Sequence, residues 1–189
     1  MKAFRQSVTV AIAALVLTSV SFGQEPSRQN GREVLEPVSV KKDLYPLDAD
    51  ANEEIDEALK QAVIEKRRVL LVFGGNWCYD CHVLDQALHE GAAGKVVKES
   101  FLVVHVDIGE GDKNLDLVKK YKTTLDKGVP VVVILSSGGS LLYGSGDGEF
   151  EAARKMMKKD LVAFLRRWKE VTRVPHIKGR SRLRGHLGL

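Results

Sequence analysis

Cys78 and Cys81 are the two cysteines of this 189-residue chain, and only two residues separate them. A C-x-x-C pair can cycle between a dithiol and a disulfide by thiol–disulfide exchange. His82 follows directly and completes C-x-x-C-H, the pattern that attaches a c-type haem through two thioethers and an axial imidazole. Residues 74–82 (GGNWCYDCH) therefore allow two chemistries, and the elements that position them must decide.

The cysteines are expected to lie between a buried strand and a helix. Residues 69–73 are a continuous apolar run, which is typical of a central, parallel strand buried on both faces. From Cys78 to about Gly91 the apolar residues recur at helical spacing. A cysteine in the first turn of a helix lies among unpaired N–H groups at the positive end of the helix dipole, which favours the thiolate. Cys78 would then attack, and Cys81 would resolve the mixed disulfide.

The remaining pattern predicts one α/β domain. Asp50 is expected to cap a helix with Glu53 as its capping-box partner, and Asn114 to cap a shorter one. The other expected elements are strands at 101–107, 131–135 and 141–143, the last two forming a hairpin, and an amphipathic helix over about 149–170. This order predicts an α/β fold with a central mixed four-stranded sheet flanked by helices.

Haem attachment makes demands that this layout does not meet. A c-type haem needs His82 on the ligand face, usually a second axial ligand, and generally a small helical domain. Strands rich in buried apolar residues surround the motif instead. We therefore expect no cofactor and no metal site, and a c-type haem carrier is kept as an alternative of another class.

The ends of the chain differ in composition from the domain. Residues 1–23 have a positive start, an apolar stretch and small residues before Gln24, as in a secretory signal peptide. Residues 24–49 hold three prolines and are expected to form an extended leader before a domain at 50–170. Residues 171–189 carry five basic residues and no acid, and are interpreted as a basic flexible tail.

Export would place the cysteines in an oxidising compartment, periplasmic or extracellular. A disulfide that closes so short a loop constrains the unfolded chain little, so the pair is expected to serve chemistry. A dithiol in that compartment needs an electron donor, such as a membrane reductase.

An exported protein rarely meets nucleic acid, so the net charge of +4 is not taken as a sign of nucleic-acid binding. A monomer is expected.

The chain resembles the thioredoxin-like family, in particular exported thiol:disulfide oxidoreductases with a WCxxC motif. The resemblance rests on the strand at 69–73, on Trp77-Cys78-x-x-Cys81 opening a helix, and on Val129-Pro130 entering a later strand. It implies a thioredoxin-like fold and thiol–disulfide exchange with protein substrates. It also implies the alternatives of a disulfide-forming oxidant, an isomerase, and a non-catalytic module that only binds a partner.

The resemblance assigns roles to residues outside the cysteine pair. Pro130 is expected to be cis and to lie against the disulfide, which leaves the Val129 backbone free to pair with an extended substrate segment. Trp77 is expected at the rim of the substrate platform.

The chain departs from the family pattern at two places. The strand before the motif has Val72 where the family usually has a buried acid, and His105 could substitute if its side chain faces the site. Asp80 lies between the cysteines, where its charge should oppose a Cys78 thiolate and favour a reductant. His82, expected at a surface position of the helix, would partly cancel that effect if it were protonated.

Overall fold

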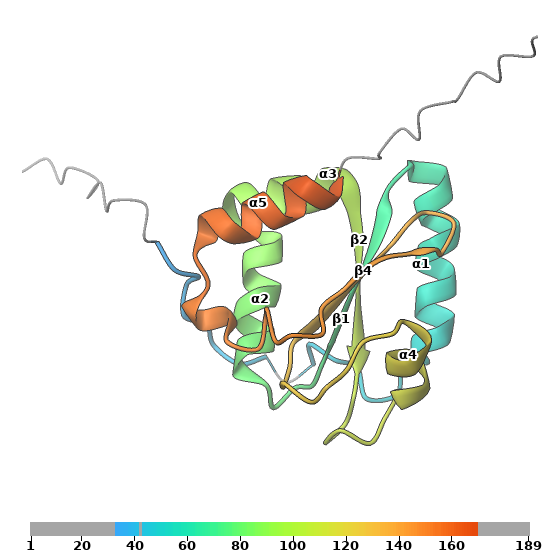
Figure 1. Ribbon diagram of the computed structural model, residues 1–189, viewed down its shortest axis with the longest axis horizontal. Helices are drawn as coiled ribbons and strands as arrows, with labels where there is room; N and C mark the ends of the chain where they lie inside the picture. Colours follow the sequence, from blue (N-terminus) through green and yellow to red (C-terminus); the bar gives the residue numbers. More distant parts are fainter. Residues whose placement is uncertain (1–32, 42, 170–189) are drawn as a thin grey trace, which may run out of the picture.

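Two layers of helices enclose a mixed four-stranded sheet (Figure 1). The computed structural model describes residues 33–41 and 43–169. The sheet order is β2-β1-β3-β4, and the elements in chain order are α1 (Ala51–Glu65), β1 (Arg68–Gly74), α2 (Tyr79–His89), α3 (Gly91–Ser100), β2 (Phe101–Asp107), α4 (Leu115–Lys120), β3 (Val131–Leu135), β4 (Leu141–Gly144), a 3-10 turn η1 (Ala153–Lys155) and α5 (Lys158–Lys169). The predicted fold class is confirmed.

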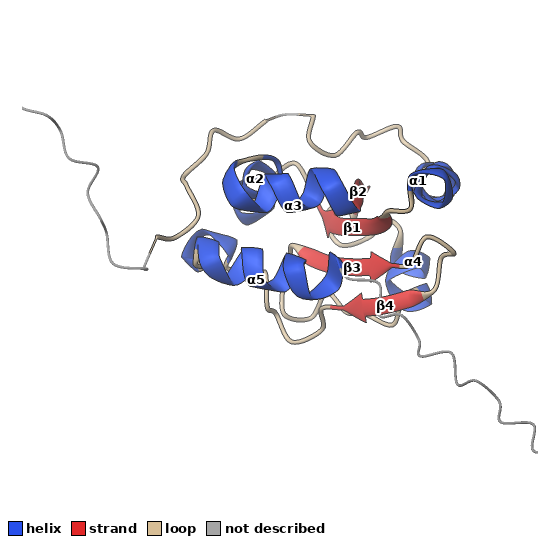
Figure 2. Cartoon of the chain, turned by 90° about the horizontal axis from the view of Figure 1, so that it is seen from above, coloured by secondary structure: helices blue, strands red, loops and turns tan. Residues whose placement is uncertain are grey.

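Strand β1 lies inside the sheet, as its apolar run predicts. It pairs in parallel with β2 and antiparallel with β3, and β3 and β4 form the predicted antiparallel hairpin. Alternate β1 side chains enter opposite cores, because successive residues of a strand point to opposite faces. Leu70 and Val72 pack among α2, α3 and α5, whereas Leu71 and Phe73 pack on the side of α1 and α4 (Figure 2).

The two predicted helix caps have different outcomes, since Asn114 precedes α4 but makes no side-chain cap hydrogen bond. The Asp50 carboxylate accepts from the backbone N–H groups of Asn52 and Glu53, so the predicted cap of α1 is confirmed. Helix α3 was not predicted, because Gly91 and Gly94 weaken the helical pattern there.

The prediction of one helix over about 149–170 is wrong at its start. Gly148 has a φ of +77°, residues 149–157 form turns and η1, and α5 begins only at Lys158. The backbone of this segment makes other contacts. The Arg154 N–H donates to Asp80, and the Leu35 N–H donates to the Met156 carbonyl.

The described residues before α1, 33–41 and 43–49, pack along the domain without forming a helix or a regular strand. Val34 makes an isolated antiparallel bridge with Met157, and Leu35 is buried in the core between α2, α3 and α5. Tyr45 lies beside the two cysteines with none of its surface exposed. This segment crosses from the α5 side past α2 to α1 (Figure 2) and contacts the first turns of α2.

Within residues 33–41 and 43–169, no helix combines the length and the hydrophobicity needed to cross a membrane. The predicted signal peptide and the predicted basic tail lie outside the described residues.

Candidate active site

The two cysteines form a disulfide at the N-terminus of α2. Cys78 is the N-cap residue of the helix, and its Sγ accepts from the Cys81 N–H at 3.1 Å. Cys81 lies one helical turn further on and is completely buried, whereas Cys78 is 5% exposed. The first turn of α2 therefore directs a backbone N–H at the outer sulfur, as the position of the motif predicts.

The loop before β3 contacts the disulfide. The Val129–Pro130 peptide bond is cis, which confirms that expectation. The Val129 carbonyl oxygen lies 3.7 Å from Cys78 Sγ, and Val129 packs against the cluster formed by Tyr45, Cys78 and Cys81. Val129 and Cys78, which are 51 positions apart in the chain, thus meet at Cys78 Sγ.

Trp77 stands on the surface next to this contact. Its side chain is held at one end, because Nε1 donates to the Gly109 carbonyl at 2.8 Å, yet the residue is 53% exposed. A cavity of about 440 Å³ lies beside it, with Leu125, Gly128 and Val129 in its wall. Trp77 and Val129 therefore border the same hollow, as a substrate platform would require.

Asp80 is paired rather than free. Its carboxylate accepts from the Arg154 N–H at 2.8 Å and from the Arg154 guanidinium, and the residue is 7% exposed. A salt bridge of this kind offsets the negative charge that the sequence places beside Cys78. The argument from Asp80 toward a reductant is therefore weaker than the sequence suggests.

His82 is buried, so its expected surface position is wrong. Its Nε2 lies 2.9 Å from the Asn76 carbonyl oxygen, and the Lys41 N–H donates to its Nδ1 at 3.4 Å. Both ring nitrogens are therefore held by backbone groups. The ring is not directed outward as an axial haem ligand would be.

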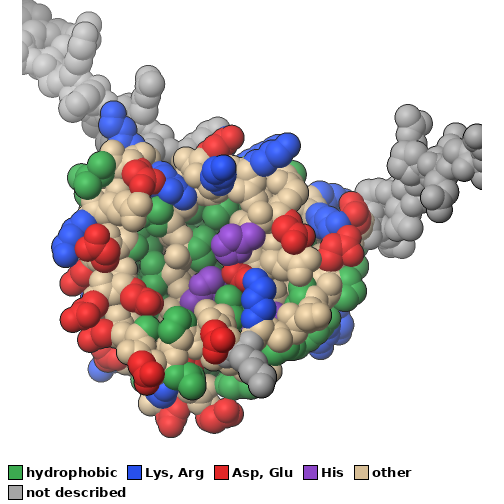
Figure 3. Space-filling view, turned by 180° about the vertical axis from the view of Figure 1, so that it is seen from behind, with side chains coloured by type: hydrophobic (Ala, Val, Ile, Leu, Met, Phe, Trp, Pro, Cys, Tyr) green, Lys and Arg blue, Asp and Glu red, His purple; other side chains and the backbone are tan. Residues whose placement is uncertain are grey.

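His105 faces a carboxylate that sequence reasoning missed. It lies opposite Val72 in the β1–β2 register, and its Nε2 is 3.2 Å from Asp85 Oδ1, an ion-pair contact without hydrogen-bond geometry. Asp85 also contacts His89 Nδ1 at 3.1 Å and Lys41 Nζ at 3.3 Å. Figure 3 shows histidine side chains close to acidic and basic side chains on one face of the domain.

The environment of Asp85 favours its charged form. Burial opposes ionisation, but the contacts with His105 and His89 outweigh it and hold the pKa of Asp85 well below its usual range. The contact with Asp85 in turn raises the pKa of His89. Asp85 and His89 lie on α2 at i, i+4 spacing, which is a signal that could have found this pair.

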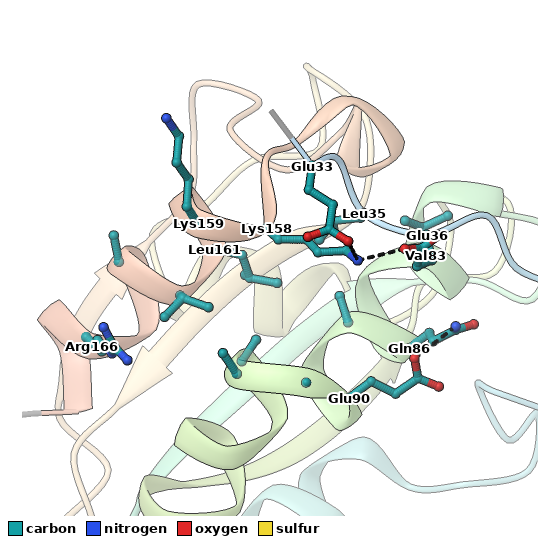
Figure 4. A pocket seen from close by; sticks show the side chains of 16 residues that line it. Glu33, Leu35, Glu36, Val83, Gln86, Glu90, Lys158, Lys159, Leu161 and Arg166 are labelled. Atoms are coloured by element: carbon teal, nitrogen blue, oxygen red, sulfur yellow. Dashed lines mark hydrogen bonds and ion pairs between the residues drawn. The ribbon is translucent and has the colours of Figure 1, made fainter. Parts of the chain in front are cut away.

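A larger cavity lies away from the cysteines. It measures about 610 Å³ and lies between α2, α3 and α5, with Leu35, Val83 and Leu161 in its wall (Figure 4). Lys158 bridges Glu33 and Glu36 at one side of it, with Nζ–O distances of 2.6 and 2.7 Å. Since no residue of the motif lines this cavity, it is not part of the candidate site.

A family model and a related crystal structure agree with this geometry. A family model described as thioredoxin-like matches residues 50–137. The crystal structure of a disulphide isomerase from Xylella fastidiosa Temecula1 is 35% identical; the match covers 67% of this chain and 97% of that one, with a TM-score of 0.61. The C-terminal domain of Neisseria meningitidis DsbD in its oxidised form is 16% identical over 63% of this chain and 96% of that one, with a TM-score of 0.46. No curated protein matches.

A C-x-x-C disulfide at a helix start, opposite a cis-proline on a mixed sheet, defines the class of thioredoxin-like oxidoreductases. Its chemistry is thiol–disulfide exchange. The chain belongs to the thioredoxin-like family.

Proposed function

We propose that this protein exchanges thiols and disulfides with protein substrates, and that it acts as a reductase. The observation that carries the proposal is the Cys78–Cys81 disulfide, whose outer sulfur lies beside the exposed Trp77 and the Val129 backbone. An extended substrate segment could pair with that backbone, as in strand addition. The 440 Å³ hollow would receive neighbouring substrate side chains.

In this reaction the reduced protein begins with two thiols. The Cys78 thiolate attacks a substrate disulfide, which forms a mixed disulfide and releases one substrate thiolate. Cys81 then loses its proton and attacks Cys78 Sγ, which closes the Cys78–Cys81 bond and releases the second substrate thiolate. Both substrate sulfurs end as thiols with the two protons that the cysteines have lost. The substrate gains two electrons and the protein loses two.

The direction toward reduction rests on the Val129 carbonyl, which acts against the N–H group that Cys81 directs at Cys78 Sγ. The Val129 carbonyl oxygen can accept a hydrogen bond from the Cys78 thiol, and its negative partial charge opposes a thiolate. A less stabilised thiolate makes the dithiol a better reductant, because a strong oxidant is one whose reduced form is stabilised. Since Asp80 is paired with Arg154, this carbonyl replaces Asp80 as the main support.

The compartment and the partner follow from the N-terminal sequence. Residues 1–23 support export, so the protein would work in the periplasm or outside the cell. A reductase in an oxidising compartment must be recharged, which requires a dithiol donor such as a membrane reductase. The basic residues near the C-terminus are not assigned to nucleic acid, and the protein is expected to act as a monomer.

Isomerisation of substrate disulfides is the second candidate. The relative that is 35% identical is titled a disulphide isomerase. An isomerase uses the same first attack but lets a substrate thiol, rather than Cys81, resolve the mixed disulfide. Oxidation of substrates would use the same residues in the opposite direction.

Two measurements test the function. A Cys81→Ala variant should accumulate covalent complexes with substrate proteins that dithiothreitol releases, whereas Cys78→Ala should accumulate none. A protein that only binds partners would give no covalent complex with either variant. A reduction potential near about −270 mV would support the reductase, and one near about −120 mV would point to an oxidant. Refolding of a scrambled-disulfide substrate without net reduction would favour the isomerase.

A further inference from the structure

The Tyr45 hydroxyl is a buried polar group without a hydrogen-bond partner among the described residues. None of the Tyr45 surface is exposed, and the residue packs in one cluster with Cys78 and Cys81. A buried hydroxyl that makes no hydrogen bond loses its hydration without compensation. Such a group calls for an explanation, and the two cysteines beside it are the groups whose bonding changes during the reaction.

The backbone of Tyr45 is fixed on the motif by Asn76. The Tyr45 N–H donates to Asn76 Oδ1 at 2.9 Å, and Asn76 Nδ2 donates to the Tyr45 carbonyl at 2.7 Å. Asn76 in turn precedes Trp77 and Cys78 directly in the chain. This pair of hydrogen bonds holds the side chain of Tyr45 in place relative to the cysteines.

The hydroxyl and the buried sulfur converge above Gly74. A Cβ atom placed on Gly74 would lie 2.5 Å from the Tyr45 hydroxyl oxygen and 2.6 Å from Cys81 Sγ. The oxygen and the sulfur therefore border the same small space, which is open because position 74 has no side chain. A modest movement of either group would bring them within hydrogen-bond distance.

We propose that Tyr45 donates a hydrogen bond to the Cys81 sulfur when the disulfide is reduced, and thereby stabilises the dithiol and the resolving thiolate. This inference rests on the proposed function of Cys81. In the disulfide each sulfur is bonded to the other and accepts hydrogen bonds weakly. Reduction by a donor dithiol adds two electrons and two protons, breaks the S–S bond and leaves Cys81 as a thiol. Its thiolate is a stronger acceptor still.

The surroundings of Tyr45 keep it a donor. Burial, and then the nearby charges of Asp85 and Asp107, raise the pKa of Tyr45 far above its usual value. The phenol therefore keeps its proton while Cys81 ionises and attacks. Tyr45 supplies the kind of polar partner that Val72 cannot supply from β1.

Tyr45→Phe tests the inference, because it removes the hydroxyl and keeps the ring. The variant loses a bond of the reduced state and removes an unpaired group from the oxidised state. Both effects favour the disulfide. We expect its equilibrium with glutathione to shift toward the disulfide by about tenfold, or about 30 mV more negative in reduction potential. In a Cys78→Ser background, Tyr45→Phe should also slow alkylation of Cys81 at neutral pH severalfold.

Tyr143→Phe is the matched control, since Tyr143 lies on the far strand β4 and its hydroxyl donates to Glu149. Equal equilibria and equal alkylation rates for Tyr45→Phe and Tyr143→Phe would overturn the inference. A measurement on the unmodified protein guards against a folding defect. With tyrosine labelled by ¹³C at Cζ, reduction should shift the Tyr45 resonance, and an unchanged resonance would count against the hydrogen bond.

The two proposals can fail separately. If Cys81→Ala traps no substrate, the proposed function fails, yet the glutathione equilibrium of the Cys78–Cys81 pair still reports on Tyr45. If Cys81→Ala traps substrates but Tyr45→Phe changes neither the equilibrium nor the alkylation, the function stands and the role of Tyr45 is refuted.

Discussion

The charge next to Cys78 depends on a pair of residues that are 74 positions apart. Asp80 lies in the first turn of α2, and Arg154 reaches it from η1. The Arg154 N–H and guanidinium both donate to the carboxylate, so the charge that would oppose a Cys78 thiolate is matched by a cation. The effect of Asp80 on the attacking thiol therefore depends on this pair and not on Asp80 alone.

Removal of the Arg154 guanidinium should make Cys78 less reactive. In Arg154→Ala the Asp80 charge acts on Cys78 without its partner, and we expect reduced Cys78 to be alkylated roughly 2- to 5-fold more slowly at pH 7, as for interactions of about 0.3–1 kcal/mol. Lys155→Ala is the matched control, because it removes the neighbouring exposed charge. Equal rates for both variants would show that the Asp80 charge does not reach the sulfur.

Asp85 gives the protein a pH-dependent stability. Its pKa is lower in the folded state than the ordinary value of 3.8, so its contribution is present above about pH 4 and is lost as the pH falls. The pKa of His89 is raised from 6.5, so its contribution is present below about pH 6.5 and is lost as the pH rises through the raised value. Lys41 and His105 are the other charged or titratable groups in contact with the carboxylate.

Asp85→Asn should therefore destabilise the protein most between about pH 4 and 6.5. The expected loss is roughly 1–3 kcal/mol, because the contacts of Lys41, His89 and His105 with a buried charge are weakened, and it should shrink outside that range. Urea unfolding from pH 3 to 8 measures the profile. Glu57→Gln, which removes a surface ion pair with Lys60, should change stability by less than about 1 kcal/mol. A pH-independent loss in Asp85→Asn would contradict the assignment.

The C-terminal end of β1 determines how closely the elements approach the disulfide. Strand β1 is inside the sheet, and at Gly74 it passes beneath both Tyr45 and Cys81. A strand paired on both sides cannot easily shift, so the space above Gly74 must come from the missing side chain. The element thereby makes room for the two groups that are proposed to interact.

Gly74→Ala should overpack this end of the strand. The added methyl group would lie 2.5 Å from the Tyr45 hydroxyl and 2.6 Å from Cys81 Sγ, so we expect a loss of roughly 1–3 kcal/mol in unfolding free energy. Gly146→Ala is the control, because a Cβ there meets nothing within 4 Å. Equal urea midpoints for the two variants would mean that the end of β1 or its neighbours can shift to accommodate the methyl group.

At the scale of the whole molecule, residues 33–41 and 43–49 are a structural part of the domain. The family model matches from residue 50, yet Leu35 and Tyr45 are buried against the helices that carry the motif. Lys158 Nζ adds ion pairs to Glu33 and Glu36 at the same side. Thus the segment before the matched region completes one core and covers the buried cysteine.

Leu35→Ala should therefore weaken the entire fold. Loss of a buried leucine side chain leaves a cavity and costs about 2–4 kcal/mol, which chemical denaturation would measure. Val40→Ala is the control from the same segment, since Val40 is half exposed and should change stability by less than about 0.5 kcal/mol. If Leu35→Ala behaved like Val40→Ala, the segment would be a dispensable leader.

The elements that depend on short-range sequence patterns could be predicted from the sequence. The β1 run at 69–73, the Asp50 cap and the β3–β4 hairpin follow from apolar patterns and capping chemistry within a few residues. The C-x-x-C pair at a helix start also belongs here, because strand, loop and helix are contiguous. The start of α5 could not be read, since residues 149–157 follow the helical period but make turns and contacts with distant residues.

The sequence by itself determined the fold class, the cysteine pair and its place at the start of a helix. Only the tertiary structure decided that His82 is buried, that Arg154 pairs with Asp80, and that Tyr45 faces the buried sulfur. The physical reason is the range of the interactions. Periodicity and capping act over a few residues, whereas a polar group deep in the protein bonds to whatever the packing brings near it, here across 31 and 74 positions of the chain.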